Sequence, residues 1–320
     1  MKQFSFIFLF ALLIALVGCA KDDVVTPPAT DDQAIEEMLT SVDSVSEFSE
    51  SDEATISDPE EMEWEKYGFN KATTPVKVFK WGRRVNSVDR NVNVTRFGDT
   101  MAVALLTKVF HGNLVIAASY EDTAHHADTI IRKPFHERIQ RKVIFARIAN
   151  SDNPRRNWKP VAISLVAGGA LPDSVNLFTI EKLEVFAPAD TYTVTEPLNT
   201  WLRLGNYRDH VPVVRHGDSV IVRLTVVSSD DSAEAVALRW AAEQGHFRER
   251  VRLVSTTPVS GGYERVYERT FRAHLPFGRF IGRYNVVLDV HSWGSLNDDA
   301  MPVSNRLWGF PYDVRRGNGN

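Results

Sequence analysis

Cysteine is almost absent from this chain of 320 residues, which contains one, Cys19. A single cysteine excludes a disulfide within the chain and any zinc site built from several cysteines. Short enzyme motifs are absent too: the sequence has no G-x-S-x-G elbow, no phosphate-binding P-loop, no dinucleotide-binding glycine pattern and no H-E-x-x-H pair. These absences disfavour an enzyme, although they do not exclude one that lacks a short motif.

Basic residues are missing from one long stretch. Residues 22–65 contain 16 Asp and Glu and no Lys or Arg, whereas the chain after residue 65 has 35 Lys and Arg against 25 Asp and Glu. The net charge of -4 therefore hides an acidic leader on a body of about +10. A basic body attracts polyanions.

The N-terminus has an unbroken apolar run, residues 4–17, which is shorter than the roughly 20 residues that span a bilayer. It has the length of a signal-peptide core. Leu16-Val17-Gly18-Cys19 resembles the lipobox of bacterial lipoproteins. The resemblance implies that residues 1–18 are a signal peptide and that Cys19 is acylated, which would leave the mature chain without a thiol nucleophile.

The residues after Cys19 carry a second resemblance. Lys21-Asp22-Asp23 is similar to the export signal of surface lipoproteins in Bacteroidota, and Ala20 is not the Asp that retains lipoproteins at the inner membrane. These features imply an outer-membrane lipoprotein whose partner is the membrane, anchored by palmitate-type chains. Two or three such chains make the anchor effectively permanent. We expect the protein to face the cell exterior; the alternative is the periplasmic side.

Residues 19–30 read as a lipidated tether, and residues 31–65 as an acidic leader containing an amphipathic helix. The helix is expected over residues 31–48, because apolar residues recur there at spacings of three and four: Ile35, Met38, Leu39, Val42, Val45 and Phe48. The helix either binds a partner or packs on its own domain.

Residues 66–170 are rich in strands, with turn signals at Phe97-Gly98-Asp99, His111-Gly112-Asn113 and Ser151-Asp152-Asn153-Pro154. The helix, a meander and the closing stretch RKVIFARIANSDNPRRNWKPVAIS are similar to cystatin-like and NTF2-like domains. This resemblance implies an antiparallel α+β domain made of residues 66–170 with helix 31–48.

The stretch AGGALPDS, residues 167–174, is the expected linker, and residues 175–320 show strands every 10 to 15 residues. Val220, Val222, Leu224 and Val226 share one face of a strand. Tyr284 shares a face with Val286, Leu288 and Val290 and resembles the tyrosine corner of immunoglobulin-like folds, and Trp240 resembles their core tryptophan. The fold class expected is mainly β: an α+β (cystatin/NTF2-like) domain followed by an immunoglobulin-like β-sandwich.

Two clusters could bind a ligand. His125, His126 and Asp128 are weak candidates for a metal site, against the alternative of a solvated loop. A basic belt could contact a polyanion through Arg138, Arg141, Lys142, Arg155 and Arg156, and it also contains Arg132, Lys133, Arg147 and Lys159. Its alternative is a solvated strand face that the chain's own acidic segment, residues 49–65, neutralises in part.

Aromatic residues near the C-terminus, Trp293, Trp308, Phe310 and Tyr312, could stack on sugar rings or pack in the core. No residue can be matched to a catalytic role, and no cofactor is expected. Nucleic acid is not a natural ligand for an exported chain. We therefore expect a non-catalytic role in binding an envelope glycan or protein, or in envelope assembly. The alternative is an envelope enzyme or small-ligand binder with its pocket in the N-terminal α+β domain.

Overall fold

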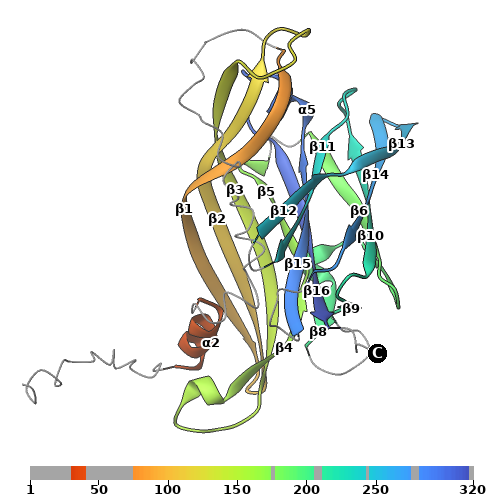
Figure 1. Cartoon of the computed structure of the whole chain (residues 1–320). Helices are drawn as coiled ribbons and strands as arrows, with labels where there is room; N and C mark the ends of the chain where they lie inside the picture. Colours follow the sequence, from red (N-terminus) through yellow and green to blue (C-terminus); the bar gives the residue numbers. More distant parts are fainter. Residues whose placement is uncertain are drawn as a thin grey trace, which may run out of the picture.

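The computed structural model describes residues 30–40, 75–173, 177–204, 211–242, 245–274 and 281–316. These residues form two sheets, in which one short strand pair is parallel and the others are antiparallel (Figure 1). The mainly β class expected from the sequence is confirmed. Within the described ranges, no helix combines the length and apolar character needed to cross a membrane.

The first sheet begins with three long strands, β1 (Lys77–Phe97), β2 (Met101–Ser119) and β3 (Thr129–Arg147). It continues through β5 (Val166–Ala170), β16 (Asn305–Arg315), β15 (Ile281–His291), β11 (Ala235–Ala242) and β12 (Gly245–Arg250). Off this path, β4 (Trp158–Ser164) pairs with β3 and β8 (Trp201–Arg203), and β9 (Val213–Arg215) pairs parallel with β16.

The second sheet has the order β13 (Arg252–Val259), β14 (Gly262–Arg272), β10 (Ser219–Ser228), β6 (Phe178–Phe186) and β7 (Thr191–Val194). It packs on β11, β15 and β16, and both sheets contribute side chains to one large core. The faces expected for β10 and β15 are confirmed, since Val222 and Leu224 enter this core together with Tyr284 and Val286. The arrangement is sandwich-like in this half of the molecule (Figure 1).

The glycines of the expected linker lie in a strand. Gly168 and Gly169 belong to β5, which hydrogen-bonds to β3 on one side and to β16 on the other. A Cβ at Gly168 would lie 2.5 Å from the backbone oxygen of Arg138, and one at Gly169 would lie 2.6 Å from that of Asn305. The sequence needs glycine here for close strand approach, so the first sheet is continuous across this point. The division of the chain into domains stays a prediction.

Helix α2 (Asp31–Thr40) covers one end of the long strands. Its Ile35 and Leu39 are buried in the main core with Ala102 and Ala104 of β2, so the alternative of packing on its own domain is the one observed. Arg96 of β1 pairs with Asp32 at the helix N-terminus, where negative charge is favoured. The rest of the expected helix, with Val42, Val45 and Phe48, lies outside the described residues.

One expected turn is wrong. Residues 111–113, the His-Gly-Asn signal, lie inside β2, which runs on for 19 residues. A Cβ at Gly112 would be 2.2 Å from the backbone oxygen of Arg84 on β1. Glycine therefore permits close strand contact here and does not end the strand.

A smaller core lies on the other face of β15 and β16. Val287 and Leu307 point away from the sandwich and contact Phe110 and Ile139 of the long strands. The short helix α5 (Trp293–Asn297) closes this core with Leu296. The long strands thus pack across the back of the sandwich, and the polar cluster described below is buried between them. Two 3-10 turns, η3 (Pro154–Arg156) and η5 (Pro197–Asn199), complete the described elements.

Candidate functional site

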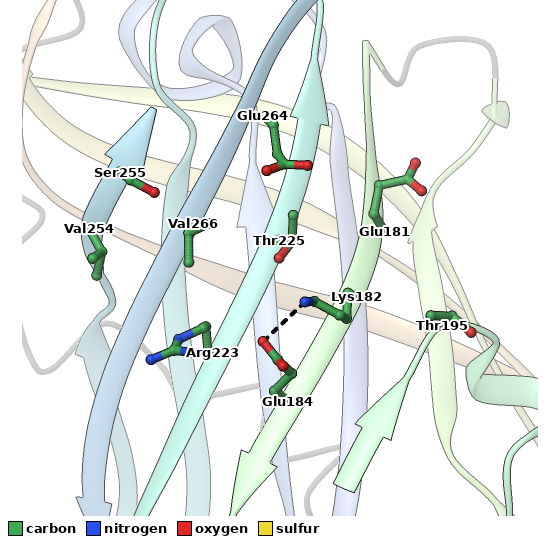
Figure 2. A pocket seen from close by; sticks show the side chains of 10 residues that line it. All are labelled: Glu181, Lys182, Glu184, Thr195, Arg223, Thr225, Val254, Ser255, Glu264 and Val266. Carbon is green, nitrogen blue, oxygen red and sulfur yellow. Dashed lines mark ion pairs between the residues drawn. The ribbon is translucent and has the colours of Figure 1, made fainter. Parts of the chain in front are cut away.

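An open hollow of about 640 Å³ lies on the outer face of the second sheet. Figure 2 shows its lining side chains, which come from β6, β10, β13, β14 and the residue after β7: Glu181, Lys182, Glu184, Thr195, Arg223, Thr225, Val254, Ser255, Glu264 and Val266. A second pocket, inside the sandwich, has only about 10 Å³ and is a packing gap between apolar side chains. Neither pocket is lined by residues 75–170.

Strand alternation and one bulge build the hollow. Leu183 and Val185 point into the core, so Glu184 between them points outward. The pairing of β6 with β10 shifts between Lys182 and Ile180, and this irregularity allows Glu181 and Lys182, which are neighbours in the chain, to line the same hollow.

Charges of both signs line the hollow, and some of them form ion pairs. Lys182 Nζ lies 3.3 Å from Glu184 Oε2, as the dashed line in Figure 2 marks. Arg223 donates from Nη2 to Glu268 Oε2 over 2.7 Å and lies over the Phe186 ring. These groups are in contact with solvent, which screens them. Such an open, charged surface suits an extended polar ligand.

Strand β13 forms one rim of the hollow, and all eight of its residues are exposed. Val254 is 57% exposed and Leu253 is 37% exposed, and no charged side chain occurs from Leu253 to Val259. Within the described part of the chain, β13 pairs with β14 alone. An uncharged edge strand can accept a further strand, here over the stretch between the register shift at Val254 and Pro258, which lacks a backbone donor.

The densest group of titratable side chains lies elsewhere, between the long strands and β11, β15 and β16. Arg83 Nη1 donates to Glu137 Oε1 and its Nη2 to Asp289 Oδ2, both over 2.6 Å. Asn305 Nδ2 donates to Glu137 Oε2 over 2.6 Å and to Asp289 Oδ1 over 3.1 Å. These bonds close a ring of four side chains. We use the name buried polar network for this ring together with Arg239 and His291, which bind Asp289.

Asp289 is the centre of the buried polar network. Its Oδ2 also accepts from Arg239 Nη2, and His291 Nε2 lies 2.9 Å away. Burial opposes the charge on Asp289, but Arg239, Arg83 and His291 outweigh it and hold its pKa well below the ordinary value. Burial lowers the pKa of Arg239 to about 10, against the attraction of Asp289, so it stays charged at neutral pH.

His291 is neutral in this setting, because burial lowers its pKa in spite of Asp289. A proton on Nε2 lets the ring donate to Asp289, and the Trp81 ring packs on it with centroids 4.4 Å apart. The network then holds two arginines and two carboxylates, and its charges balance. Its members are at most 5% exposed, so no ligand reaches them and their role is structural.

The metal candidates lie in the connection between β2 and β3. His125 and His126 are exposed, and the Asp128 carboxylate accepts a hydrogen bond from Ser119 over 2.8 Å. Within the described ranges, no three His, Cys, Asp or Glu side chains are placed to hold a metal ion. His111 of β2 and His136 of β3 are in edge-to-face contact, with ring centroids 4.6 Å apart.

The basic belt does not form one surface, because alternate residues of β3 point to opposite faces. Arg138 and Lys142 lie on the outer face, and Arg155 pairs with Glu37 of α2. Arg141 is 2% exposed and donates to Asn285, so its assignment to a polyanion contact is wrong. Arg156 is exposed.

Lys133, another member of the belt, is buried as well. Its Nζ donates to the backbone oxygens of Gly294, Ser295 and Asp298 and so holds the last turn of α5. Burial lowers its pKa to about 8.

The C-terminal aromatic residues belong mainly to the core. Trp308, Phe310 and Tyr312 are buried, so the core alternative is the observed one for these three. The side chain of Trp240 lies outside the described part of the structure, as do Cys19, Lys21, Asp22 and Asp23.

Sequence reasoning missed the buried polar network and the hollow. Asn285, Asp289 and His291 alternate with the apolar face of β15, which is the usual pattern of a strand with one solvated face. Only the long strands packed over that face reveal that it is buried. The hollow has no motif, because its residues come from separate strands.

No family model matches the chain. No curated protein matches it either.

Proposed function

We propose that this chain is a lipid-anchored lipoprotein of the outer membrane, exposed at the cell surface, with a non-catalytic role in binding an envelope protein. The anchor and the address rest on the lipobox-like Leu16-Val17-Gly18-Cys19 and on Lys21-Asp22-Asp23. We also propose the finer fold, a cystatin- or NTF2-like domain followed by an immunoglobulin-like sandwich. Helix α2 on long antiparallel strands supports the first part, and Tyr284 in the sandwich core supports the second.

The exposed edge of β13 beside the open hollow is the observation that carries the binding role. A partner segment in extended conformation would add to β13 by backbone hydrogen bonds, and its side chains would reach the mixed charges of the hollow. The hollow has no aromatic lining residue, which favours a protein segment over a glycan that stacks on rings. The alternative of an enzyme pocket within residues 66–170 gains no support from either described pocket.

Site-specific photo-cross-linking in whole cells tests this proposal. A photoreactive residue at Val254 should give one discrete cross-linked species, whereas the same residue at Met301, which is 41% exposed on another surface, should not. Adding Thr256→Lys should abolish the Val254 product, because charge on an edge strand opposes pairing. Equal cross-linking from both positions, or none from Val254, would reject β13 as the binding edge.

A further inference from the structure

Three strongly exposed apolar side chains lie at the α2 end of the long strands. Phe97 is 53%, Met101 40% and Ile148 62% exposed. Phe97 pairs with Met101 across the β1–β2 turn, and Met101 pairs with Ala146 of β3, two residues before Ile148. They therefore form one surface and are not three scattered exposures.

The surface extends along the outer face of the sheet. Val103 and Leu105 of β2 and Ile144 and Ala146 of β3 share that face and are half-buried. The opposite face carries Ala102, which is buried under α2. We call the set Phe97, Met101, Val103, Leu105, Ile144, Ala146 and Ile148 the apolar face.

Charges around the apolar face nearly cancel. Arg96 pairs with Asp32, and Arg155 pairs with Glu37. Asp99 in the β1–β2 turn and Asp152 after β3 offset two of the remaining cations at this end, Lys142, Arg156 and Lys159. A partner of this surface would therefore be held by apolar contact and not by charge.

The N-terminal tether enters the fold at the same end of the long strands as the apolar face, although α2 itself lies on the opposite face of the sheet. Helix α2 begins at Asp31, and Arg96, adjacent to Phe97, pairs with Asp32. From Cys19 to Thr30 there are 11 residue steps, which span about 40 Å at full extension. Strand β1 has 21 residues and is about 70 Å long, so its other end lies much farther from the tether.

We propose that the apolar face rests on the lipid surface to which Cys19 is attached. This inference depends on the lipid anchor of the proposed function. Three exposed apolar side chains bind a bilayer weakly by themselves. A short tether makes the contact intramolecular and raises its effective concentration, so weak contact suffices to set the orientation. In this orientation β13, drawn at the far side of the molecule from α2, points away from the membrane (Figure 1).

The single cysteine allows a direct test. With the Cys19 sulfur acylated, an introduced cysteine is the only free thiol, so a fluorophore can be placed at Ile148→Cys or, as the control, at Val254→Cys, which is similarly exposed at 57%. The full acylated chain is reconstituted in phosphatidylcholine vesicles that carry a lipid-bound quencher. We expect quenching at position 148 to exceed that at position 254 at least threefold, and to change little with added phosphatidylglycerol.

Substitutions test which side chains make the contact. The double variant with Phe97→Ser and Met101→Ser should reduce quenching at position 148 to the level seen at position 254. It should keep the circular dichroism spectrum of the parent. Equal quenching at both positions on vesicles that float with the protein would overturn the inference and leave the anchor intact. Failure to float with vesicles would overturn the anchor and this inference with it.

Two further results would also reject apolar docking on lipid. One is quenching that requires phosphatidylglycerol, which indicates electrostatic binding. The other is a concentration-dependent dimer that shields position 148 without lipid quenching, which assigns the apolar face to a second copy of the chain.

Discussion

Asn305 shows how much the buried polar network depends on one amide. Both carboxylates of the network accept from its Nδ2, so the residue separates two negative charges that would otherwise face one another. Glu137 and Asp289 each keep an arginine as well, and every bond lies in a region from which water is excluded. In such a place the loss of one donor costs far more than at the surface.

Asn305→Asp should lower the free energy of unfolding by about 3 to 5 kcal/mol, because a third carboxylate would be buried without its own cation. Urea denaturation measures this loss. Asn93→Asp makes the same chemical change at an exposed position of β1 and should stay within about 0.5 kcal/mol of the parent. Equal effects of the two substitutions would show that water is not excluded from the buried polar network.

His291 makes the free energy of unfolding depend on pH in the mildly acidic range. Burial lowers its pKa in the folded chain below the value of about 6.5 in the unfolded chain, so below pH 6.5 the unfolded chain binds more protons at this site. The folded chain therefore loses stability as the pH falls below 6.5, with a slope of at most about 1.4 kcal/mol per pH unit from this residue.

His291→Gln removes this titration, so its free energy of unfolding should fall less steeply than that of the parent between pH 6.5 and pH 5. Denaturation at several pH values compares the two slopes. His126→Gln changes an exposed histidine and should keep the slope of the parent. If the free energy of unfolding changed with pH at the same slope in the parent and in His291→Gln, the buried, neutral state of His291 would be contradicted.

At the scale of elements, the sequence predicts strands and their faces well and predicts their ends poorly. The alternation in β10 and the helix at Asp31 follow from residue periodicity alone. Strand β2 is longer than its sequence predicts, because Gly112 signals a turn unless a neighbouring strand approaches closely. The same ambiguity affects Gly168: the pattern of two glycines fits a linker as well as a crowded strand. Local sequence does not contain the tertiary contact that decides between them.

Gly168→Ala tests this assignment. The new Cβ would lie 2.5 Å from the backbone oxygen of Arg138, so β3 and β5 must separate, and we expect a loss of about 1 to 3 kcal/mol in the free energy of unfolding. Gly294→Ala is the control: its Cβ would meet the Met301 side chain at 3.4 Å, an ordinary contact, and the residue is helical. A flexible linker at residue 168 would instead tolerate the alanine.

At the scale of the whole molecule, the long strands combine two tasks. They cover the back of the sandwich through the smaller core, and at their other end they carry α2, the first described element of the chain. The continuous first sheet links these tasks, since β5 pairs with both β3 and β16. If the apolar face sets the orientation on lipid, the continuous first sheet carries that orientation to β16 and the sandwich.

Cys19→Ser should detach the protein from the outer membrane, because acylation needs the thiol and no other cysteine is present. Fractionation of cells measures the loss from the outer-membrane fraction. Ser5→Ala, within the signal segment, should leave the distribution unchanged. A Cys19 variant that still fractionates fully with the outer membrane would contradict the anchor.

Replacing Lys21, Asp22 and Asp23 by alanine should leave the protein bound to the membrane but hide it from protease added to whole cells, because the acyl chains hold it while the export signal is lost. Replacing Val24, Val25 and Thr26 by alanine changes an equal length of the tether and should keep the protein accessible. Because the tether extends only about 40 Å, a protein facing the periplasm cannot reach the medium by flexibility alone. If the first variant keeps its protease sensitivity, the proposed export signal is rejected, whereas the proposed lipid anchor is not affected.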